Sequence, residues 1–121
     1  MDMVKERGIG IEVSPISNQV LGLVKDLRNH PASILFSQDF PVIISNDDPG
    51  LWKSKGLSFD FYEAFVGIMS RKADLRALKK LAINSINYSA MDDNEKSRAM
   101  NIWKRKWNIF IKNVTQDLHL T

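Results

Sequence analysis

The chain has 121 residues, of which 44% are hydrophobic, and its formal net charge is +3. This length suits one small domain, and the composition is typical of a globular protein rather than a disordered one. The absence of cysteine excludes disulfide bonds and thiolate metal sites. Because basic residues are mixed with acidic ones, we expect no nucleic-acid binding, and no apolar run is long enough to span a membrane.

The first half of the sequence predicts a strand, a helix and a second strand. Residues 1–7 have the character of a helix end, which Gly8 stops. Residues 10–13 and 42–45 are short apolar strand candidates, and residues 17–29 between them carry apolar side chains at helical spacing. Strand, helix and strand in this order form a βαβ unit, in which we expect parallel strands.

The second half predicts a loop at residues 50–56 and then three helices. Ser58 or Asp60 caps the first helix, residues 73–88 form the second, and residues 92–95 form a capping box for the third. The third helix carries an apolar stripe that is typical of a core-facing surface. The stripe consists of Met100, Trp103, Trp107, Phe110, Val114 and Leu118.

Two parallel strands followed by three helices make an incomplete domain. A two-stranded parallel sheet has two open edges and buries little surface. Parallel strands normally belong to larger sheets that helices cover on both faces. We therefore interpret the sequence as the final portion of a larger α/β protein.

Two adjacent carboxylates, Asp47 and Asp48, follow the second predicted strand. In parallel α/β folds, acidic residues at the carboxyl end of a strand lie where ligands and metals bind. A Pro-Gly pair, Pro49 and Gly50, comes directly after them. The same residues are also ordinary turn formers, so the local pattern allows either a site or a turn.

The other candidate groups favour structural interpretations. His30 stands at a predicted helix end before a proline, where interaction with the helix dipole is the expected role, and His119 is expected to be solvated. Trp103 and Trp107 flank three cations, but their i, i+4 spacing favours an amphipathic helix over a base-stacking surface. One or two aspartates cannot complete a zinc site, which needs three or four ligands.

Several segments resemble the adenosine deaminase-related growth factors, the extracellular relatives of adenosine deaminase, and the similarity is strongest to insect members. These segments follow one another in the same order over nearly the whole chain. They are residues 12–21, 26–31, 41–52, 55–65 and 73–76.

This resemblance implies an α/β fold in the form of a (β/α)8 TIM barrel. Residues 10–13 would form the seventh strand and residues 42–45 the eighth, so this helix-rich chain would carry the last two parallel strands. Residues 1–121 would then be a C-terminal fragment of an adenosine deaminase catalytic domain.

The resemblance also implies a reaction. The family hydrolyses adenosine or 2′-deoxyadenosine to inosine or 2′-deoxyinosine and ammonia, with a Zn2+ ion at the carboxyl face of the barrel. Asp47 matches the zinc-ligand aspartate, and Asp48 matches the neighbouring aspartate that binds the purine. The histidine ligands, the proton-shuttling glutamate and the catalytic histidine would lie upstream of Met1, so we expect no catalytic residue in this chain and no activity from the chain alone.

A secreted, homodimeric parent is a further implication, because the family's secretion signal and dimer-forming segment would also lie upstream. The chain itself begins without a signal peptide and, if Met1 is the true start, would stay in the cytosol. The sequence departs from the family in two places: Ser14 stands where relatives often have cysteine, and Trp52-Lys53-Ser54 replaces a smaller sequence in a loop beside the site. The alternative function is a noncatalytic, growth-factor-like or partner-binding module.

Overall fold

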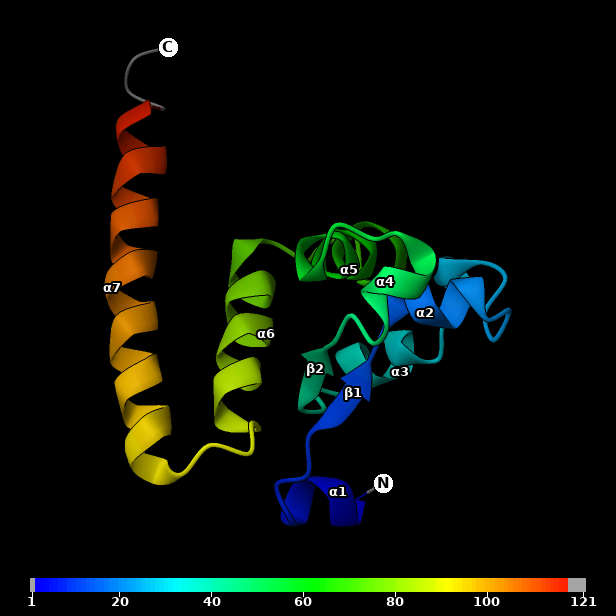
Figure 1. Ribbon diagram of the computed structural model, residues 1–121, viewed down its shortest axis with the longest axis horizontal. Coiled ribbons are helices and arrows are strands. Elements are labelled where there is room, and N and C mark those ends of the chain that lie inside the picture. Colours follow the sequence, from blue (N-terminus) through cyan, green and yellow to red (C-terminus); the bar gives the residue numbers. More distant parts are fainter. Residues whose placement is uncertain (1, 118–121) are drawn as a thin grey trace. The chain divides into compact units, whose positions relative to one another are not determined.

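The computed structural model describes residues 2–117, which divide after Tyr88 into two compact units. No helix in this described part of the chain is long and apolar enough to cross a membrane. The second unit contains the helix α7 (Asp93–Asp117). In chain order the first unit contains α1 (Asp2–Glu6), β1 (Ile11–Val13), α2 (Pro15–Val20), the 3-10 helix η1 (Leu27–Asn29), α3 (Ala32–Ser37), β2 (Val42–Ile44), α4 (Pro49–Trp52), α5 (Leu57–Glu63), the π-helical segment η2 (Ala64–Ile68) and α6 (Leu75–Asn87) (Figure 1).

The two strands pair in parallel, as the βαβ pattern predicts. The register places Val13 opposite Ile44, and the amide of Ser45 donates to the carbonyl oxygen of Val13 at 3.0 Å. The carboxyl ends of β1 and β2 therefore lie at the same end of the sheet. This confirms the predicted strand pairing and, within the described residues, gives a sheet of two strands.

The core of the first unit surrounds β2. Both Val42 and Ile44 are buried, and α6 packs against this strand through a face that includes Leu81. The helix α5 also contacts β2, while α2 packs against α5 and η1 against η2. The buried apolar cluster comprises Val13, Leu27, Ala32, Val42, Ile44, Ala64, Ile68 and Leu81.

The helix predicted over residues 17–29 is wrong in its length. The observed helix α2 begins at Pro15, the first-turn position where proline is well tolerated, and ends at Val20. Gly22 then adopts a φ of +71°, a left-handed conformation that ends the helix readily because glycine has no Cβ. The chain returns to helical geometry only in the 3-10 turn η1.

The segment after Asp48 also differs from the prediction. The predicted loop at residues 50–56 contains the short helix α4, and the N-cap of α5 is Gly56 rather than Ser58 or Asp60. Asp60 lies inside α5 and is fully buried. This helix continues as η2, so the backbone changes pitch directly after the turn that contains Asp60.

The predicted helices in the last third of the chain are confirmed. The helix α6 matches the prediction for residues 73–88, and the side chain of its N-cap residue Asp74 accepts a hydrogen bond from the Arg76 amide at 2.9 Å. The capping box before α7 is reciprocal. The Glu95 amide donates to Asp92 Oδ1 at 2.8 Å, and the Asp92 amide donates to Glu95 Oε2 at 3.2 Å.

The apolar stripe of α7 forms one aromatic-rich face. Trp103 and Trp107 stack with ring centroids 5.3 Å apart, and Phe110 lies 5.6 Å from Trp107. No described residue of α7 is buried, so the predicted role of this stripe as a core-facing surface is not confirmed. Leu118, the last predicted member, lies outside the described residues.

The close packing beside the start of β1 gives a test of the fold. A Cβ atom added at Gly10 would clash with the Ile43 side chain and lie 2.9 Å from Tyr88 Cβ. Overpacking of this kind typically costs about 1–3 kcal/mol, so we expect Gly10→Ala to lower the free energy of unfolding by that amount in urea denaturation. The matched control is Gly50→Ala, because a Cβ at Gly50 meets open space. A Gly10→Ala variant as stable as the Gly50→Ala control would contradict this packing.

Candidate functional site

The candidate site lies where the carboxyl ends of β1 and β2 meet. The start of α2, including Ile16 and Ser17, follows β1, and residues 46–48 follow β2 (Figure 1). Because the strands are parallel, these two segments lie beside each other although about thirty residues separate them, as the contact from Ser17 to Asp47 shows. The local sequence pattern left open whether Asp47 and Asp48 form a site or a turn. The structure places both residues just after the carboxyl end of β2, next to the carboxyl end of β1.

Asp47 is held in a defined orientation although it is exposed. Its Oδ2 atom accepts a hydrogen bond of 2.6 Å from the hydroxyl of Ser17, which is only 1% exposed. The backbone of Asp47 has a φ of +56°, a conformation that aspartate tolerates better than most residues. Among the described residues, no hydrogen-bond donor reaches Oδ1, so one carboxylate oxygen is fixed and the other is open.

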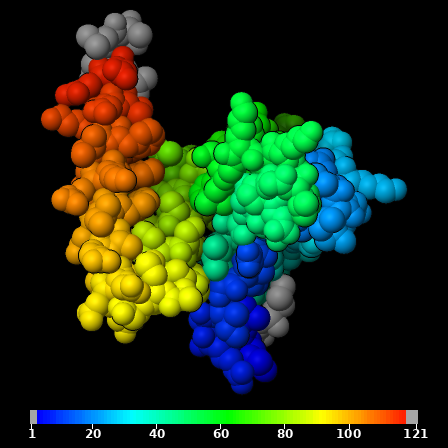
Figure 2. Space-filling model, viewed as in Figure 1, coloured from blue at the N-terminus to red at the C-terminus, as the bar shows by residue number. Residues whose placement is uncertain are grey.

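A second carboxylate, that of Asp60 on α5, joins the same two segments. Its Oδ1 accepts from the Ile16 amide at 3.0 Å, and its Oδ2 accepts from Asn46 Nδ2 at 2.6 Å. Asp60 belongs to α5, which packs against α2. In Figure 2 the green surface of the segment that contains α4 and α5 lies in front of the blue atoms of α2. Burial raises the pKa of Asp60, while the hydrogen bonds from Ile16 and Asn46 act in the opposite direction.

The surroundings of Asp48 are less constrained. Asp48 is exposed and occupies the N-cap position of α4, but its side chain makes no capping hydrogen bond. In the loop that follows, Trp52 is half-buried, and its indole Nε1 donates to the carbonyl oxygen of Asn46 at 3.5 Å. Trp52 therefore packs beside the site, while the carboxylate of Asp48 is not engaged in capping.

His30 has a structural role, as predicted, but for a different reason. The side chain is 5% exposed, its Nδ1 accepts from the Ala32 amide at 3.0 Å, and its Nε2 lies 2.9 Å from Asn18 Oδ1. Since Nδ1 accepts, Nε2 carries the proton and the ring is neutral. Burial also lowers the pKa of His30, which favours the neutral ring. The hydrogen bonds of both ring nitrogens, rather than a charge at a helix end, therefore account for its structural role.

The described residues contain no group of three or more histidine, cysteine, aspartate or glutamate side chains that could hold a metal ion. Asp47 fits one position in a metal site, because an open, oriented carboxylate oxygen is a suitable ligand for zinc. Zinc sites use three or four protein ligands, and at this position we identify one among the described residues, Asp47.

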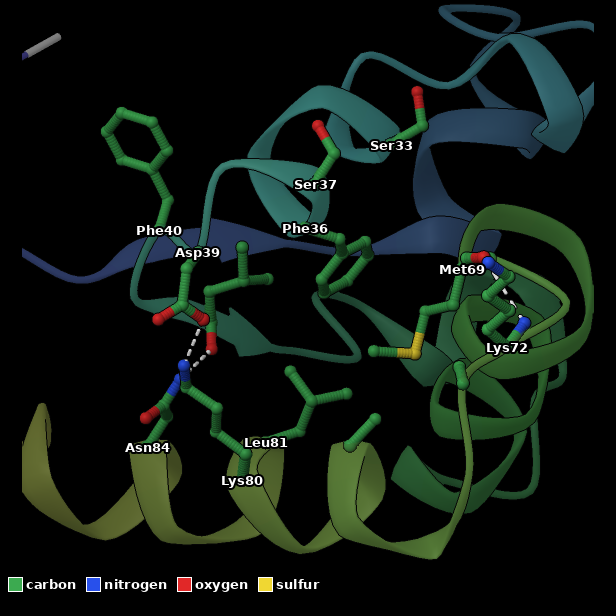
Figure 3. Close-up of a pocket in the computed structure, with 14 residues that line it drawn as sticks. Ser33, Phe36, Ser37, Asp39, Phe40, Met69, Lys72, Lys80, Leu81 and Asn84 are labelled. Atoms are coloured by element: carbon green, nitrogen blue, oxygen red, sulfur yellow. Dashed lines mark hydrogen bonds and ion pairs between the residues drawn. The ribbon is translucent and has the colours of Figure 1, made fainter.

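A separate cavity of about 290 Å3 lies between α3, β2 and α6. Figure 3 shows Phe36, Met69 and Leu81 converging on it, with the ion pair of Asp39 and Lys80 at one end. Neither Asp47 nor Asp48 lines this cavity. The largely apolar lining contains no arrangement of acids and bases that resembles the strand-end site.

Sequence reasoning found Asp47 and Asp48 but missed Ser17, Asn46 and Asp60. A signal for Asp60 exists in the sequence, because Asp60, Ala64 and Ile68 are spaced by four residues and share a helix face, and both apolar residues are buried. An acidic residue on a buried face is a recognised marker of function or of a special structural role. Ser17 and Asn46 have no such signal, since only the strand pairing brings them to the site.

Comparison with known proteins identifies related sequences. A family model described as "Adenosine deaminase" matches residues 1–103. The chain is 56% identical over 109 residues to "Adenosine deaminase 2" of Homo sapiens and 57% identical over 109 residues to "Adenosine deaminase" of Lutzomyia longipalpis. It is 46% identical over 112 residues to "Adenosine deaminase 2" of Dictyostelium discoideum.

The alignments cover 90%, 89% and 92% of this chain, respectively, but only 21%, 22% and 20% of the three relatives. The chain thus spans about a fifth of the length of the proteins that it matches.

The neutral state of His30 predicts a pH dependence of stability. Because its folded-state pKa lies below the usual value of 6.5, the unfolded chain binds more protons, and the free energy of unfolding should fall as pH drops below 6.5. We expect His30→Gln to remove this part of the pH dependence in denaturant unfolding between pH 7.5 and 5.5, a range chosen to bracket the usual histidine pKa of about 6.5. The control is His119→Gln. His119 lies outside the described residues, and because the sequence predicts a solvated side chain there, this variant should keep the pH dependence. An unchanged slope in His30→Gln would contradict the assignment.

Proposed function

The chain belongs to the adenosine deaminase family, and from this we propose that the protein containing it deaminates adenosine or 2′-deoxyadenosine hydrolytically. The observation that carries the proposal is the geometry of Asp47. One carboxylate oxygen is fixed by Ser17, the other is open, and the residue lies at the shared carboxyl end of two parallel strands. Enzymes built on parallel strands place their catalytic and ligand-binding groups at this end.

We propose that β1 and β2 are the last two strands of a (β/α)8 barrel. The βαβ order and the parallel register support this assignment, as does the position of α6 against β2. Each strand pairs on one side only within the described residues, so each has an edge to which a further strand could add. A closed barrel removes such edges.

We further propose that Asp47 is one ligand of a zinc ion and that the other ligands belong to the parent protein outside these residues. When bound, zinc makes water a nucleophile near neutral pH. The role of this chain is to present one oriented oxygen: Ser17 holds Oδ2 and leaves Oδ1 for the ion. Because the rest of the site would come from elsewhere, the chain alone should show no turnover.

Asp48 is proposed to orient the purine. Its carboxylate is exposed and makes no capping hydrogen bond, so it can form a hydrogen bond to a ring nitrogen of the base. Its position directly after Asp47 would place the base beside the metal ligand. Secretion and homodimer formation of the parent remain expectations from the family resemblance.

A segment exchange tests this function. The matching segment of the Lutzomyia longipalpis adenosine deaminase is replaced by the aligned residues of this chain, and the purified chimera is assayed by loss of adenosine absorbance and by zinc content. We expect turnover and bound zinc from the chimera, and neither from the 121-residue chain by itself. A chimera that is folded, by its thermal unfolding, but inactive would refute the proposal.

Substitutions in the active chimera separate the two aspartates. Asp47→Asn should lower kcat/KM by at least about 100-fold together with zinc content, because even residues around metal ligands typically contribute about 10–100-fold. Asp48→Asn should keep the zinc and lower kcat/KM by about 10–100-fold, which corresponds to one charge-assisted hydrogen bond of about 1.5–3 kcal/mol. The control is Asp93→Asn on α7, which should keep full activity. Full activity in the Asp47→Asn variant would exclude Asp47 as a zinc ligand.

A further inference from the structure

The buried carboxylate of Asp60 accepts hydrogen bonds from both segments that form the site. The Ile16 amide, 3.0 Å from Oδ1, belongs to the residue before Ser17. The side-chain nitrogen Nδ2 of Asn46 donates to Oδ2 at 2.6 Å, and Asn46 is the residue before Asp47. Two bridges therefore cross the same gap one residue apart: the Asp60 bridge and the hydrogen bond from Ser17 to Asp47.

We propose that Asp60 is a positioning residue that fixes Asp47 by joining the start of α2 to the end of β2 through its two carboxylate oxygens. A carboxylate is planar and rigid, so its two acceptors set the separation of the groups that they bind. With Ile16 and Asn46 held in this way, Ser17 and Asp47 are brought within hydrogen-bond distance. That the positioned group, Asp47, serves as a zinc ligand rests on the proposed deaminase function.

The cost of burying Asp60 supports a role beyond packing. Asp60 is fully buried, and none of the ion pairs in the described part of the chain includes it. Its partners on Ile16 and Asn46 are neutral amides, which offset the burial of a charge only in part. A hydrophobic residue on this face of α5 would avoid that cost but could not bridge the two segments.

The bridge also constrains the left-handed backbone of Asp47. Asp47 has a φ of +56°, one of three positive φ values at non-glycine residues in the described part of the chain, and aspartate adopts this conformation more readily than most residues. The side chain of Asn46 is anchored on one side of this residue, and the Asp47 carboxylate is anchored to Ser17. Without the Asp60 bridge, the segment after β2 would lose the first of these two constraints.

A double-mutant cycle in two backgrounds tests the proposal in the full 121-residue chain. The cycle combines Ser17→Ala with Asp47→Ala and measures their coupling from shifts in urea midpoint at constant m-value. The coupling should be present with Asp60 and lost in Asp60→Ala. If Asp60 only stabilised the fold, Asp60→Ala would lower the midpoint but leave the coupling unchanged, and that result would overturn the proposal.

A second variant exchanges the side chains at positions 46 and 60, so that the proposal can be tested even if Asp60→Ala does not fold. In the pair Asn46→Asp and Asp60→Asn, the new asparagine can still accept from Ile16 and can donate to the new aspartate. We expect this pair to fold and to regain the coupling between Ser17 and Asp47, whereas Asn46→Asp alone, which places two carboxylates face to face, should be the least stable. If the exchanged pair does not fold, or folds without the coupling, the proposal is wrong.

This cycle uses neither zinc nor substrate, so it separates the two proposals. An inactive chimera with an intact cycle would reject the deaminase function and retain the bridge. An active chimera with an unchanged coupling in Asp60→Ala would retain the function and reject the positioning role. In an active chimera we also expect Asp60→Ala to lower the zinc bound per chain and the exchanged pair to restore it.

Discussion

The parallel pairing of β1 with β2 is the constraint on which the site depends. It brings the start of α2 and the segment after β2 to the same end of the sheet. There Ser17 donates a hydrogen bond to Asp47, and Asp60 accepts hydrogen bonds from both Ile16 and Asn46. An antiparallel pairing would place these segments at opposite ends of the sheet. The three hydrogen bonds are therefore consequences of the strand direction, and one of them, from Ser17, holds the Asp47 carboxylate.

The apolar packing of the first unit and the polar contacts at its strand ends contribute differently to the structure. The apolar residues around β2 supply burial, with Val42 and Ile44 at the centre and α6 against the strand. At the strand ends, burying the Asp60 carboxylate costs stability that its hydrogen bonds offset only in part. Asn46 Oδ1 is also buried there without a hydrogen-bond partner in the described part of the chain. Such costs are characteristic of functional sites, where geometry matters more than the stability of each group.

Local sequence patterns predicted the elements of this chain better than their ends or their contacts. The parallel strands, α6 and the capping box of α7 follow from periodicity and capping residues, which act within a few positions. The helix over residues 17–29 failed because Gly22 takes a left-handed conformation that periodicity does not register. The pair Asp47 and Asp48 was visible in the sequence, but the roles of Ser17, Asn46 and Asp60 arise from contacts across 14 to 44 positions.

If the open oxygen of Asp47 is a zinc ligand in the parent protein, the ion lies beside it in crystals of the chimera, where anomalous diffraction at the zinc edge locates it directly. We expect a zinc peak about 2.0–2.2 Å from Asp47 Oδ1, the usual zinc–carboxylate distance, with Oδ2 still bonded to Ser17. A zinc ion held without Asp47, or no zinc near the ends of β1 and β2 in an active chimera, would contradict it.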